Sequence, residues 1–477
     1  MSDTAIGMVG LGVMGRNLAL NIEEHGFSCA AYDAWPEPVD KFVAESAGKQ
    51  ISGFKDIGAF VRALRRPRRV IMLVKAGDVV DKTIAALLPH LEPGDMLVDA
   101  GNEYYVNTER RTRELEPKQV RYFGMGVSGG EYGARHGPSM MPGGDRAAYD
   151  ELAPIFTKIA AQHRDGPCVT YIGPGGSGHY VKMVHNGIEY GDMQLIAEAY
   201  DVLKTLGGFG NEELADVFDA WNGAELESFL IEITAKILRK RDGDGKGFLV
   251  DQILDATGMK GTGKWTVQDA AELGAPLTTI ATSVDARVLA AGKAERVKAS
   301  ALLPGPTPVA STAARSPSPA DRQKLIADVR AALYAAKACS YAQGLNLLRL
   351  ASEARKWNLR LGELARIWQD GCIIRAKFLG RIKAAFDADA SLPNLLLDPS
   401  FREELATRQD GWRNVVAECA RAGLPLLSTG GSLGYYDMIR RERLPANLTQ
   451  AQRDFFGAHT YKRIDREGDF HTEWSEP

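Results

Sequence analysis

The residues best placed to do chemistry lie in one stretch, HYVKMVHNGIEYGDMQ (179–194). On a helix, Lys182, Asn186 and Glu189 fall within about 60° of one another, with His185 beside them. A lysine whose pKa is lowered by burial can act as a general base, and a glutamate can act as an acid. A solvated ion pair would use the same two residues. The dense polar face on an otherwise apolar helix favours a ligand site.

Further groups suited to an anionic substrate lie elsewhere in the chain. The segment KGTGKW (260–265) and Arg287 add cationic and backbone donors. The segment VSGG (127–130) places Ser128 directly after a predicted strand, at the carboxyl end of a sheet. Ligands of doubly wound folds bind at that end.

The segment GLGVMG, with Gly10, Gly12 and Gly15, follows the first predicted strand and opens a helix. Such glycines permit a tight turn, close approach of backbone to a pyrophosphate, and close packing of the helix on the sheet. The N–H groups at the helix start favour phosphate. A strand–turn–helix corner can also use glycine for geometry alone, but the repeated strand–helix alternation favours dinucleotide binding.

Asp33 ends the second predicted strand, 18 residues after Gly15. A ribose-binding acid usually follows the glycine loop by about 20 residues. A carboxylate there would bind the ribose hydroxyls of NAD and repel the 2′-phosphate of NADP. The next residues are Ala34 and Trp35, so no neighbouring cation would neutralise that phosphate. The alternative is a turn acid before Pro36.

These groups require a parallel sheet and a helical domain to position them. Apolar runs predict strands over 6–10, 27–33, 69–74, 95–101 and 121–127, separated by helices, as in a Rossmann-like doubly wound α/β fold. Helical periodicity then dominates, over 179–206, 211–220, 225–240, 264–273, 278–291, 320–345 and 346–388. A Pro- and Ser-rich surface loop is expected at 302–323. We predict a dinucleotide-binding domain (1–178), an all-helical substrate and dimerisation domain (179–440) and a tail of weak periodicity (441–477).

The composition excludes several classes of protein. A net charge of −3 over 477 residues gives no electrostatic case for nucleic acid or an anionic membrane. No uncharged apolar run is long enough to span a bilayer, and no signal peptide is recognised. Five dispersed cysteines without a CxxC pair argue against zinc and fit a reducing cytoplasm.

Taken together, the motifs resemble those of the long-chain, decarboxylating 6-phosphogluconate dehydrogenase family. The resemblance spans nearly the whole chain and includes GLGVMG, LVKAG, AGN, GVSGGEYGARHGPSMMPGG, KMVHNGIEYGDMQL, KGTGKW and LPANLTQAQRDFFGAHTY. It implies oxidation of 6-phospho-D-gluconate at C3 and loss of CO2 to give ribulose 5-phosphate, in the pentose phosphate pathway. It also implies a metal-free reaction and a homodimer.

The resemblance assigns roles to individual residues. Lys182 would be the base and Glu189 the acid that completes the reaction. The substrate would be held by Asn102, Ser128, Gly129, Gly130, His185, Asn186, Tyr190, Lys260, Thr262 and Arg287, with Arg453 and His459 supplied by the partner subunit's tail. The cofactor would be held by Gly10, Leu11, Gly12, Val13, Met14, Gly15, Asp33, Ala34, Trp35, Val74, Lys75, Ala76 and Asn102.

One departure from the family bears on the cofactor. NADP-dependent members carry Asn-Arg-Thr at the end of the second strand, where this chain has Asp33-Ala34-Trp35. Gly12 stands where many long-chain members have alanine. Both changes favour NAD, with NADP as the alternative, and Trp35 could stack on the adenine.

Two rival functions use the same scaffold. A hydroxyacid dehydrogenase of the 3-hydroxyisobutyrate type shares the glycine loop and a lysine base, but such chains are shorter and lack KGTGKW and RDFFGAHTY. A non-catalytic NAD-binding protein would have lost a catalytic residue, whereas Lys182 and Glu189 are both present.

Overall fold

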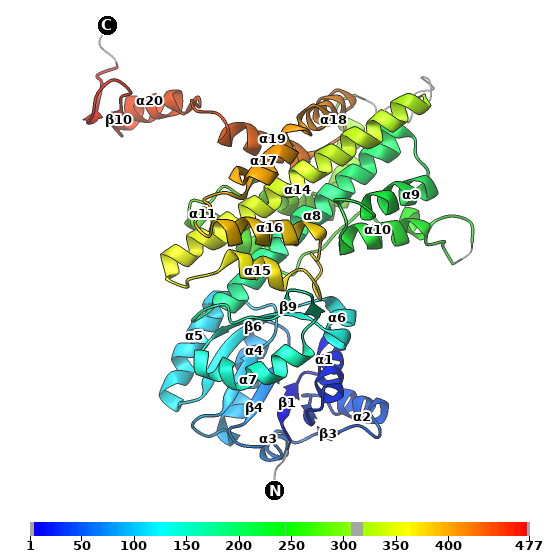
Figure 1. Ribbon diagram of the computed structural model, residues 1–477, viewed down its shortest axis with the longest axis vertical. Coiled ribbons are helices and arrows are strands. Elements are labelled where there is room, and N and C mark those ends of the chain that lie inside the picture. Colours follow the sequence, from blue (N-terminus) through cyan, green and yellow to red (C-terminus); the bar gives the residue numbers. More distant parts are fainter. Residues whose placement is uncertain (1–3, 244, 307–317, 475–477) are drawn as a thin grey trace.

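A computed structural model of the chain describes residues 4–243, 245–306 and 318–474. An α/β domain adjoins a helical body, and the C-terminal tail projects away from that body (Figure 1). The seven-stranded sheet has the order β3-β2-β1-β4-β5-β6-β7, with β7 antiparallel to β6 and the other pairs parallel. Its strands are β1 (Ile6–Val9), β2 (Cys29–Tyr32), β3 (Ile51–Phe54), β4 (Arg69–Met72), β5 (Met96–Asp99), β6 (Arg121–Ser128) and β7 (Ser139–Gly144).

The predicted doubly wound sheet is confirmed, although its prediction omitted two strands. All four residues of β1 and of β5 are buried, which explains their continuous apolar sequences. The omitted strands are β3, with the sequence ISGF, and β7, with the sequence SMMPGG. Glycine, serine and proline weaken the usual strand signal, so neighbouring strands and not local propensity determine these two.

Helices cover both faces of the sheet. They are α1 (Val13–Glu24), α2 (Pro36–Glu45), α3 (Ile57–Arg62), α4 (Asp78–Leu87), η1 (Leu88–His90), α5 (Tyr105–Leu115), η2 (Glu116–Lys118), α6 (Gly130–His136) and α7 (Arg146–Ile159). A short hairpin of β8 (Gln162–His163) and β9 (Gly166–Pro167) leads toward the helical body.

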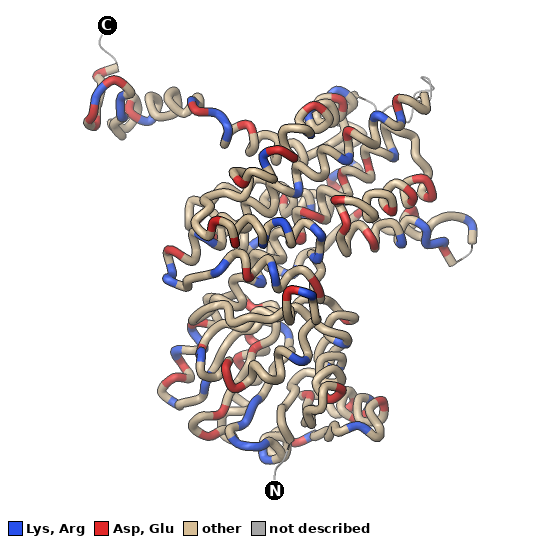
Figure 2. Tube along the Cα trace, in the orientation of Figure 1, with Lys and Arg blue, Asp and Glu red and all other residues tan. Residues whose placement is uncertain are grey.

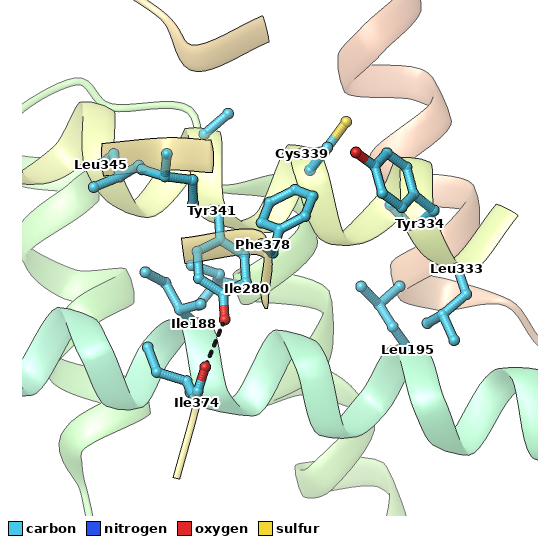
Figure 3. Close-up of a cluster of buried hydrophobic side chains, with 14 of the residues drawn as sticks. Ile188, Leu195, Ile280, Leu333, Tyr334, Cys339, Tyr341, Leu345, Ile374 and Phe378 are labelled. Carbon is cyan, nitrogen blue, oxygen red and sulfur yellow. Dashed lines mark hydrogen bonds between the residues drawn. The ribbon is translucent and has the colours of Figure 1, made fainter. Parts of the chain in front are cut away.

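The helical body is built around two long helices, α8 (Ser177–Gly207) and α14 (Pro319–Arg355), which run side by side (Figure 1). The others are α9 (Asn211–Asn222), α10 (Phe229–Arg239), η3 (Leu249–Gln252), α11 (Thr262–Glu272), α12 (Thr278–Ala291), α13 (Lys293–Leu302), α15 (Leu361–Ile367), α16 (Lys377–Ala388), η5 (Leu395–Leu397), α17 (Pro399–Ala406), α18 (Gln409–Ala422) and α19 (Leu427–Ile439). Figure 3 shows side chains of α8, α14 and their neighbours interlocking in this core.

The predicted helix boundary between residues 345 and 346 is wrong. The helix α14 continues to Arg355, and Lys356 ends it in the left-handed conformation with φ of 56°. Gly344 lies inside the helix, where a Cβ atom would come within 2.6 Å of Ile188 on α8. This glycine therefore serves close packing of two helices and does not mark a break.

The tail is more ordered than its weak periodicity predicts. It contains α20 (Ala446–Gly457) and a hairpin of β10 (Tyr461–Lys462) and β11 (Asp469–Phe470). The buried carboxylate of Asp454 organises it by accepting hydrogen bonds from the backbone of Thr460 and Thr472 and from the indole of Trp474. Single polar contacts of this kind leave no periodic signal in a sequence.

The structure also bears on the predicted loop at 302–323, on the distribution of charge and on membrane spanning. Of the predicted loop at 302–323, residues 307–317 lie outside the described part of the chain. Acidic and basic residues alternate along the chain in both the α/β domain and the helical body (Figure 2). Within the described residues, no helix is both long enough and apolar enough to cross a membrane.

Candidate active site

The polar face predicted on 179–194 lies in the first half of α8, at its contact with the sheet. Lys182 is 5% exposed and His185 is fully buried. Lys182 Nζ lies 3.5 Å from His185 Nδ1, which lies 4.0 Å from Glu189 Oε2. No ion pair of Lys182 occurs among the described residues. The structure therefore brings the proposed base and acid together without joining them as a salt bridge.

His185 connects this face of α8 to the end of β6. Its Nε2 atom lies 3.2 Å from Ser128 Oγ, and its Nδ1 atom lies 3.0 Å from Asn186 Oδ1. The amide oxygen beside Nδ1 assigns the ring proton to that nitrogen, so Nε2 accepts from the serine hydroxyl. The backbone N–H of Ile373 also donates to Ser128 Oγ at 3.4 Å.

Burial shifts the three titratable groups in directions that suit proton transfer. It lowers the pKa of Lys182 below its usual value, because the charged ammonium is desolvated. It raises the pKa of Glu189 for the corresponding reason and holds the pKa of His185 well below the usual range. The histidine is therefore neutral, the lysine has an increased neutral fraction, and the glutamate has an increased protonated fraction.

The helix α11 brings the second predicted group of residues to the same place. Its first residue, Thr262, accepts a hydrogen bond from Asn186 Nδ2 at 3.3 Å. A Cβ atom at Gly263 would lie 2.7 Å from the ring of Tyr190, so glycine is needed for this close approach. The Arg287 guanidinium carbon lies 3.5 Å from the centroid of the same ring. Tyr190, Thr262 and Arg287 thus border the polar face of α8, with Lys260 exposed just before α11.

The glycine loop has the backbone that a dinucleotide site requires. Gly10 has a φ of 93°, and a Cβ atom at Gly15 would lie 1.9 Å from the carbonyl oxygen of Gly10. At Gly12 a Cβ atom would meet no protein atom within 4 Å, which leaves open space beside the loop. The helix α1 has no side-chain cap and no acidic residue in its first turn, so its N–H groups remain available to phosphate.

Asp33 supports this loop directly. Its Oδ2 atom accepts from the backbone N–H of Leu11 at 2.8 Å, and its Oδ1 atom accepts from that of Trp35 at 3.1 Å. The second contact forms the turn that is expected if Asp33 serves as a turn acid before Pro36. Each carboxylate oxygen has a further lone pair, and the side chain is half-buried, so a ribose hydroxyl can still donate to it. The indole of Trp35 is 72% exposed.

The remaining predicted residues fall into two groups. The turn of Val74, Lys75 and Ala76 follows β4 next to the glycine loop, and Asn102 is exposed after β5. Arg453 and His459 belong to the tail, which Figure 1 shows projecting away from the helical body of its own chain. The single chain does not bring these two residues to the polar face of α8.

Two family models together account for nearly the whole chain. Residues 5–173 match the NAD-binding domain of 6-phosphogluconate dehydrogenase, and residues 178–474 match the C-terminal domain of that enzyme. The chain belongs to the 6-phosphogluconate dehydrogenase family. Because the second model covers the helical body and the tail, the match distinguishes this family from the shorter hydroxyacid dehydrogenases.

Individual family members are similar over their full length. The decarboxylating 6-phosphogluconate dehydrogenase 1 of Spinacia oleracea is 58% identical over 99% of this chain and 98% of its own. The enzyme of Synechococcus elongatus is 56% identical over 99% of this chain and all of its own. A solved Plasmodium falciparum 6-phosphogluconate dehydrogenase, described in apo form and in complexes with NADP+ and with 6-phosphogluconate, is 45% identical, with a TM-score of 0.93 and coverage of 98% and 100%.

Some residues that hold this family site together were not predicted. Ile373 reaches Ser128 from a loop of the helical body, and the carboxylate of Glu103 accepts from the backbone N–H of Gly77 at 2.8 Å. Glu103 directly follows the AGN motif, so its proximity to that motif was an available signal. Ile373 lies 245 residues from its partner and gives no local signal.

Proposed function

We propose that this chain oxidises 6-phospho-D-gluconate at C3 and releases CO2 to give D-ribulose 5-phosphate, with NAD+ preferred as the hydride acceptor. The observation that supports this most strongly is Lys182, a buried lysine without a carboxylate partner among the described residues, beside a neutral histidine that also contacts Ser128. Relatives that match nearly the whole chain are named as decarboxylating 6-phosphogluconate dehydrogenases, which supports the same reaction here.

The chemistry follows from the protonation states at the site. Bound nicotinamide supplies the acceptor for the C3 hydride. Lys182 takes the proton of the C3 hydroxyl as the alcohol becomes a ketone. The product is a β-keto acid, whose C1–C2 bond breaks to release CO2 and leave its electron pair in an enolate. Protonated Lys182 stabilises the enolate oxygen, and Glu189 donates a proton to the carbon that becomes C1 of the pentulose.

The other residues bind and orient the substrate in this proposal. His185 and Asn186 hold its hydroxyls, while Ser128, Gly129 and Gly130 hold the carboxylate and the C3 region. Tyr190, Lys260, Thr262 and Arg287 bind its phosphate, and Asn102 lies on the nicotinamide side. No metal is required for the reaction.

The preference for NAD+ rests on Asp33. Its carboxylate stands at the end of β2 beside the glycine loop, where it repels a 2′-phosphate and can accept from ribose hydroxyls. Gly10 to Gly15 hold the pyrophosphate, Ala34 and Trp35 lie on the adenine side, and Val74 to Ala76 lie on the nicotinamide side. The solved Plasmodium relative is described with NADP+, so this preference would be a departure within the family.

Steady-state oxidation of 6-phosphogluconate with NAD+ and NADP+ in parallel tests both parts of the proposal. We expect CO2 and ribulose 5-phosphate in equal amounts, and a higher kcat/KM for NAD+. Asp33→Asn keeps an acceptor for the N–H of Leu11 and removes the negative charge together with the acceptor for the N–H of Trp35. This variant, and more so Asp33→Asn/Ala34→Arg, should raise the NADP+ to NAD+ ratio of kcat/KM by at least about tenfold, or about 1.4 kcal/mol. A higher kcat/KM for NADP+ in the unmodified enzyme would refute the role of Asp33.

We also propose that the active enzyme is a homodimer in which each tail completes the partner's site with Arg453 and His459. The tail exposes Leu448, Phe455 and Phe456 by 62%, 63% and 73% around an apolar hollow of about 270 Å³. Apolar surface of this kind on a projecting segment is characteristic of an interface. We further propose a cytoplasmic location, which the five free cysteines support because they fit a reducing compartment.

Subunit complementation tests the exchange of tails. Lys182→Met and Arg453→Ala should each be inactive, yet a mixed dimer would contain one site with both residues intact. Coexpression of the two variants should therefore restore about a quarter of the activity, since half of the dimers are mixed and one of their two sites works. Absence of any recovery, with mixed dimers demonstrated by differential tags, would show that each tail serves its own subunit.

A further inference from the structure

The short loop that follows Asn102 contacts both halves of the molecule. On one side, Glu103 is 2% exposed and accepts from the backbone N–H of Gly77 at 2.8 Å and from Arg111 Nη1 at 2.7 Å. Gly77 ends the turn that begins at Val74, on the side proposed for the nicotinamide. Glu103 therefore fixes the loop to the cofactor domain by charge-assisted hydrogen bonds.

On its other side, the same loop contacts α11. The ring of Tyr104 stacks on Trp265, with centroids 5.1 Å apart and an angle of 27° between the planes. Tyr105 donates its hydroxyl proton to Asp269 Oδ1 at 2.7 Å. Trp265 and Asp269 are four residues apart and so lie on one face of α11. Two consecutive tyrosines therefore join two consecutive turns of the helix that begins at Thr262.

Asp269 is 3% exposed and is the centre of this contact. Besides Tyr105, it accepts from the hydroxyl of Tyr180 and from Arg355 Nη2, the latter at 2.7 Å. The guanidinium of Arg355 also donates to the Tyr105 oxygen at 2.6 Å and neutralises the buried carboxylate. Burial raises the pKa of both tyrosines, so their hydroxyls remain donors. A buried network in which Asp269 accepts from both tyrosine hydroxyls and from Arg355 fixes one geometry.

The network joins three segments that carry parts of the proposed site: the loop after Asn102, α8 and α11. Tyr180 precedes Lys182 by two residues on α8, and Thr262 begins the helix that carries Asp269. We propose that Asp269 is a positioning residue that couples the binding of the dinucleotide to the binding of 6-phosphogluconate. This inference rests on the proposed function.

The coupling acts in both directions. A dinucleotide that orders the turn at Val74–Gly77 and Asn102 also fixes Tyr104 and Tyr105, and with them α11 and Thr262. The substrate then binds to a helix that is already in place. By linkage, bound substrate must increase the affinity for the dinucleotide by the same factor.

The test measures the dissociation constant of 6-phosphogluconate with and without the reduced dinucleotide that the enzyme forms, so that no turnover occurs. In the unmodified enzyme, the reduced dinucleotide should tighten substrate binding by about fivefold or more. Tyr105→Phe removes one hydroxyl from the contact between the two family domains. It should reduce this ratio to near one while leaving the dissociation constant of the dinucleotide alone unchanged.

Tyr180→Phe is the matched control, because it removes one hydroxyl from the same carboxylate without crossing between the domains. It should keep the unmodified ratio. Tyr104→Leu, which removes the stacking on Trp265, should lower the ratio as Tyr105→Phe does, and thermal unfolding identifies any variant that is merely unfolded. The proposal is overturned by a ratio near one in the unmodified enzyme, by an unchanged ratio in Tyr105→Phe, or by equal losses in the two phenylalanine variants. Failure of the unmodified enzyme to oxidise 6-phosphogluconate would instead reject the proposed function.

Discussion

Two buried lysines, Lys182 on α8 and Lys337 on the neighbouring α14, have different surroundings. Lys337 of α14 places its Nζ atom 2.7 Å from Asp192 Oδ2, and both side chains are 2% exposed. Lys182, on the site face of α8, places its Nζ atom 3.5 Å from His185 Nδ1 and forms no ion pair with a carboxylate among the described residues. Asp192 and Glu189 are less than one turn apart, so the same helix carries a paired and an unpaired acid.

This difference indicates that the Lys337–Asp192 pair stabilises the fold, whereas Lys182 is available for proton transfer in the proposed reaction. In the core, Tyr341 also donates toward Asp192 at 3.2 Å and lies 3.3 Å from the carbonyl of Ile374, a contact visible in Figure 3. In such a pair each charge stabilises the other. At the site, desolvation acts on Lys182 and Glu189 without a matching direct contact, which leaves both groups ready to exchange protons.

The largest expected effect is the loss of activity on replacing Lys182. Lys182→Met should lower kcat by about 10³-fold or more, because it removes the base and the stabilising charge. The free energy of unfolding should not fall, since the methionine replaces a buried amine that lacks an ionic partner. Steady-state turnover and denaturant unfolding measure the two quantities. Turnover at the unmodified rate would exclude Lys182 as the base.

Replacing Lys337 should lower stability and leave turnover nearly unchanged, the opposite of the effect expected at Lys182. Lys337→Met leaves Asp192 as a buried uncompensated charge and should cost about 3–5 kcal/mol of stability. The double variant Lys337→Met/Asp192→Leu removes both charges and should recover most of that loss, with turnover near that of the unmodified enzyme. If the double variant were as unstable as the single one, the pair would not be the source of the stability.

The pH dependence of kcat/KM should distinguish the two partners in the site. Activity falls on the acid side as Lys182 is protonated, and it falls on the alkaline side as Glu189 loses its proton. Because the pKa of Lys182 is lowered, the acid limb lies at lower pH than an ordinary lysine would give. Because the pKa of Glu189 is raised, the alkaline limb lies at higher pH than an ordinary glutamate would give. Glu189→Gln should lower kcat and abolish the alkaline limb. Persistence of that limb at the same midpoint would assign it to another group.

The smallest effect is expected at the half-exposed ion pair of Asp81. Its cost in stability can be compared with the effects expected at Lys182 and at the Lys337–Asp192 pair. Hydrogen bonds from Arg111 and then Arg110 lower the pKa of Asp81 to about 2. A depressed folded-state pKa stabilises above the unfolded value of about 3.9, and the contribution is lost as pH falls toward 2. Asp81→Asn should therefore cost about 1 kcal/mol at pH 6 and almost nothing at pH 2. A cost that persisted at pH 2 would point to lost hydrogen bonds instead of charge.

Much of this architecture could be predicted because its signals are local. The shared helical face of Lys182, Asn186 and Glu189 follows from their spacing alone. Gly10 and Gly15 indicate a turn whose backbone requires glycine. The strands β3 and β7 could not be predicted, since neighbours in the sheet compensate for glycine and proline in their sequences. Their physical cause lies outside the segment itself.

Contacts between distant segments were equally hidden. Asp269 is 164 residues from Tyr105, and nothing near either residue in the sequence predicts that they meet. The support that Asp33 gives to Leu11 also depends on the register of β1 against β2. The sequence predicted the groups proposed to react, whereas the contacts that position them required the folded structure.

The most direct test is the pH dependence of the reactivity of the Lys182 amine. Competitive acetylation followed by mass spectrometry gives a midpoint for each lysine that is independent of how accessible it is. The account predicts a Lys182 midpoint clearly below that of the exposed lysines of the same chain, and protection of Lys182 by 6-phosphogluconate. A Lys182 midpoint equal to or above theirs would show that the lysine is charged at working pH and would contradict its role as the base.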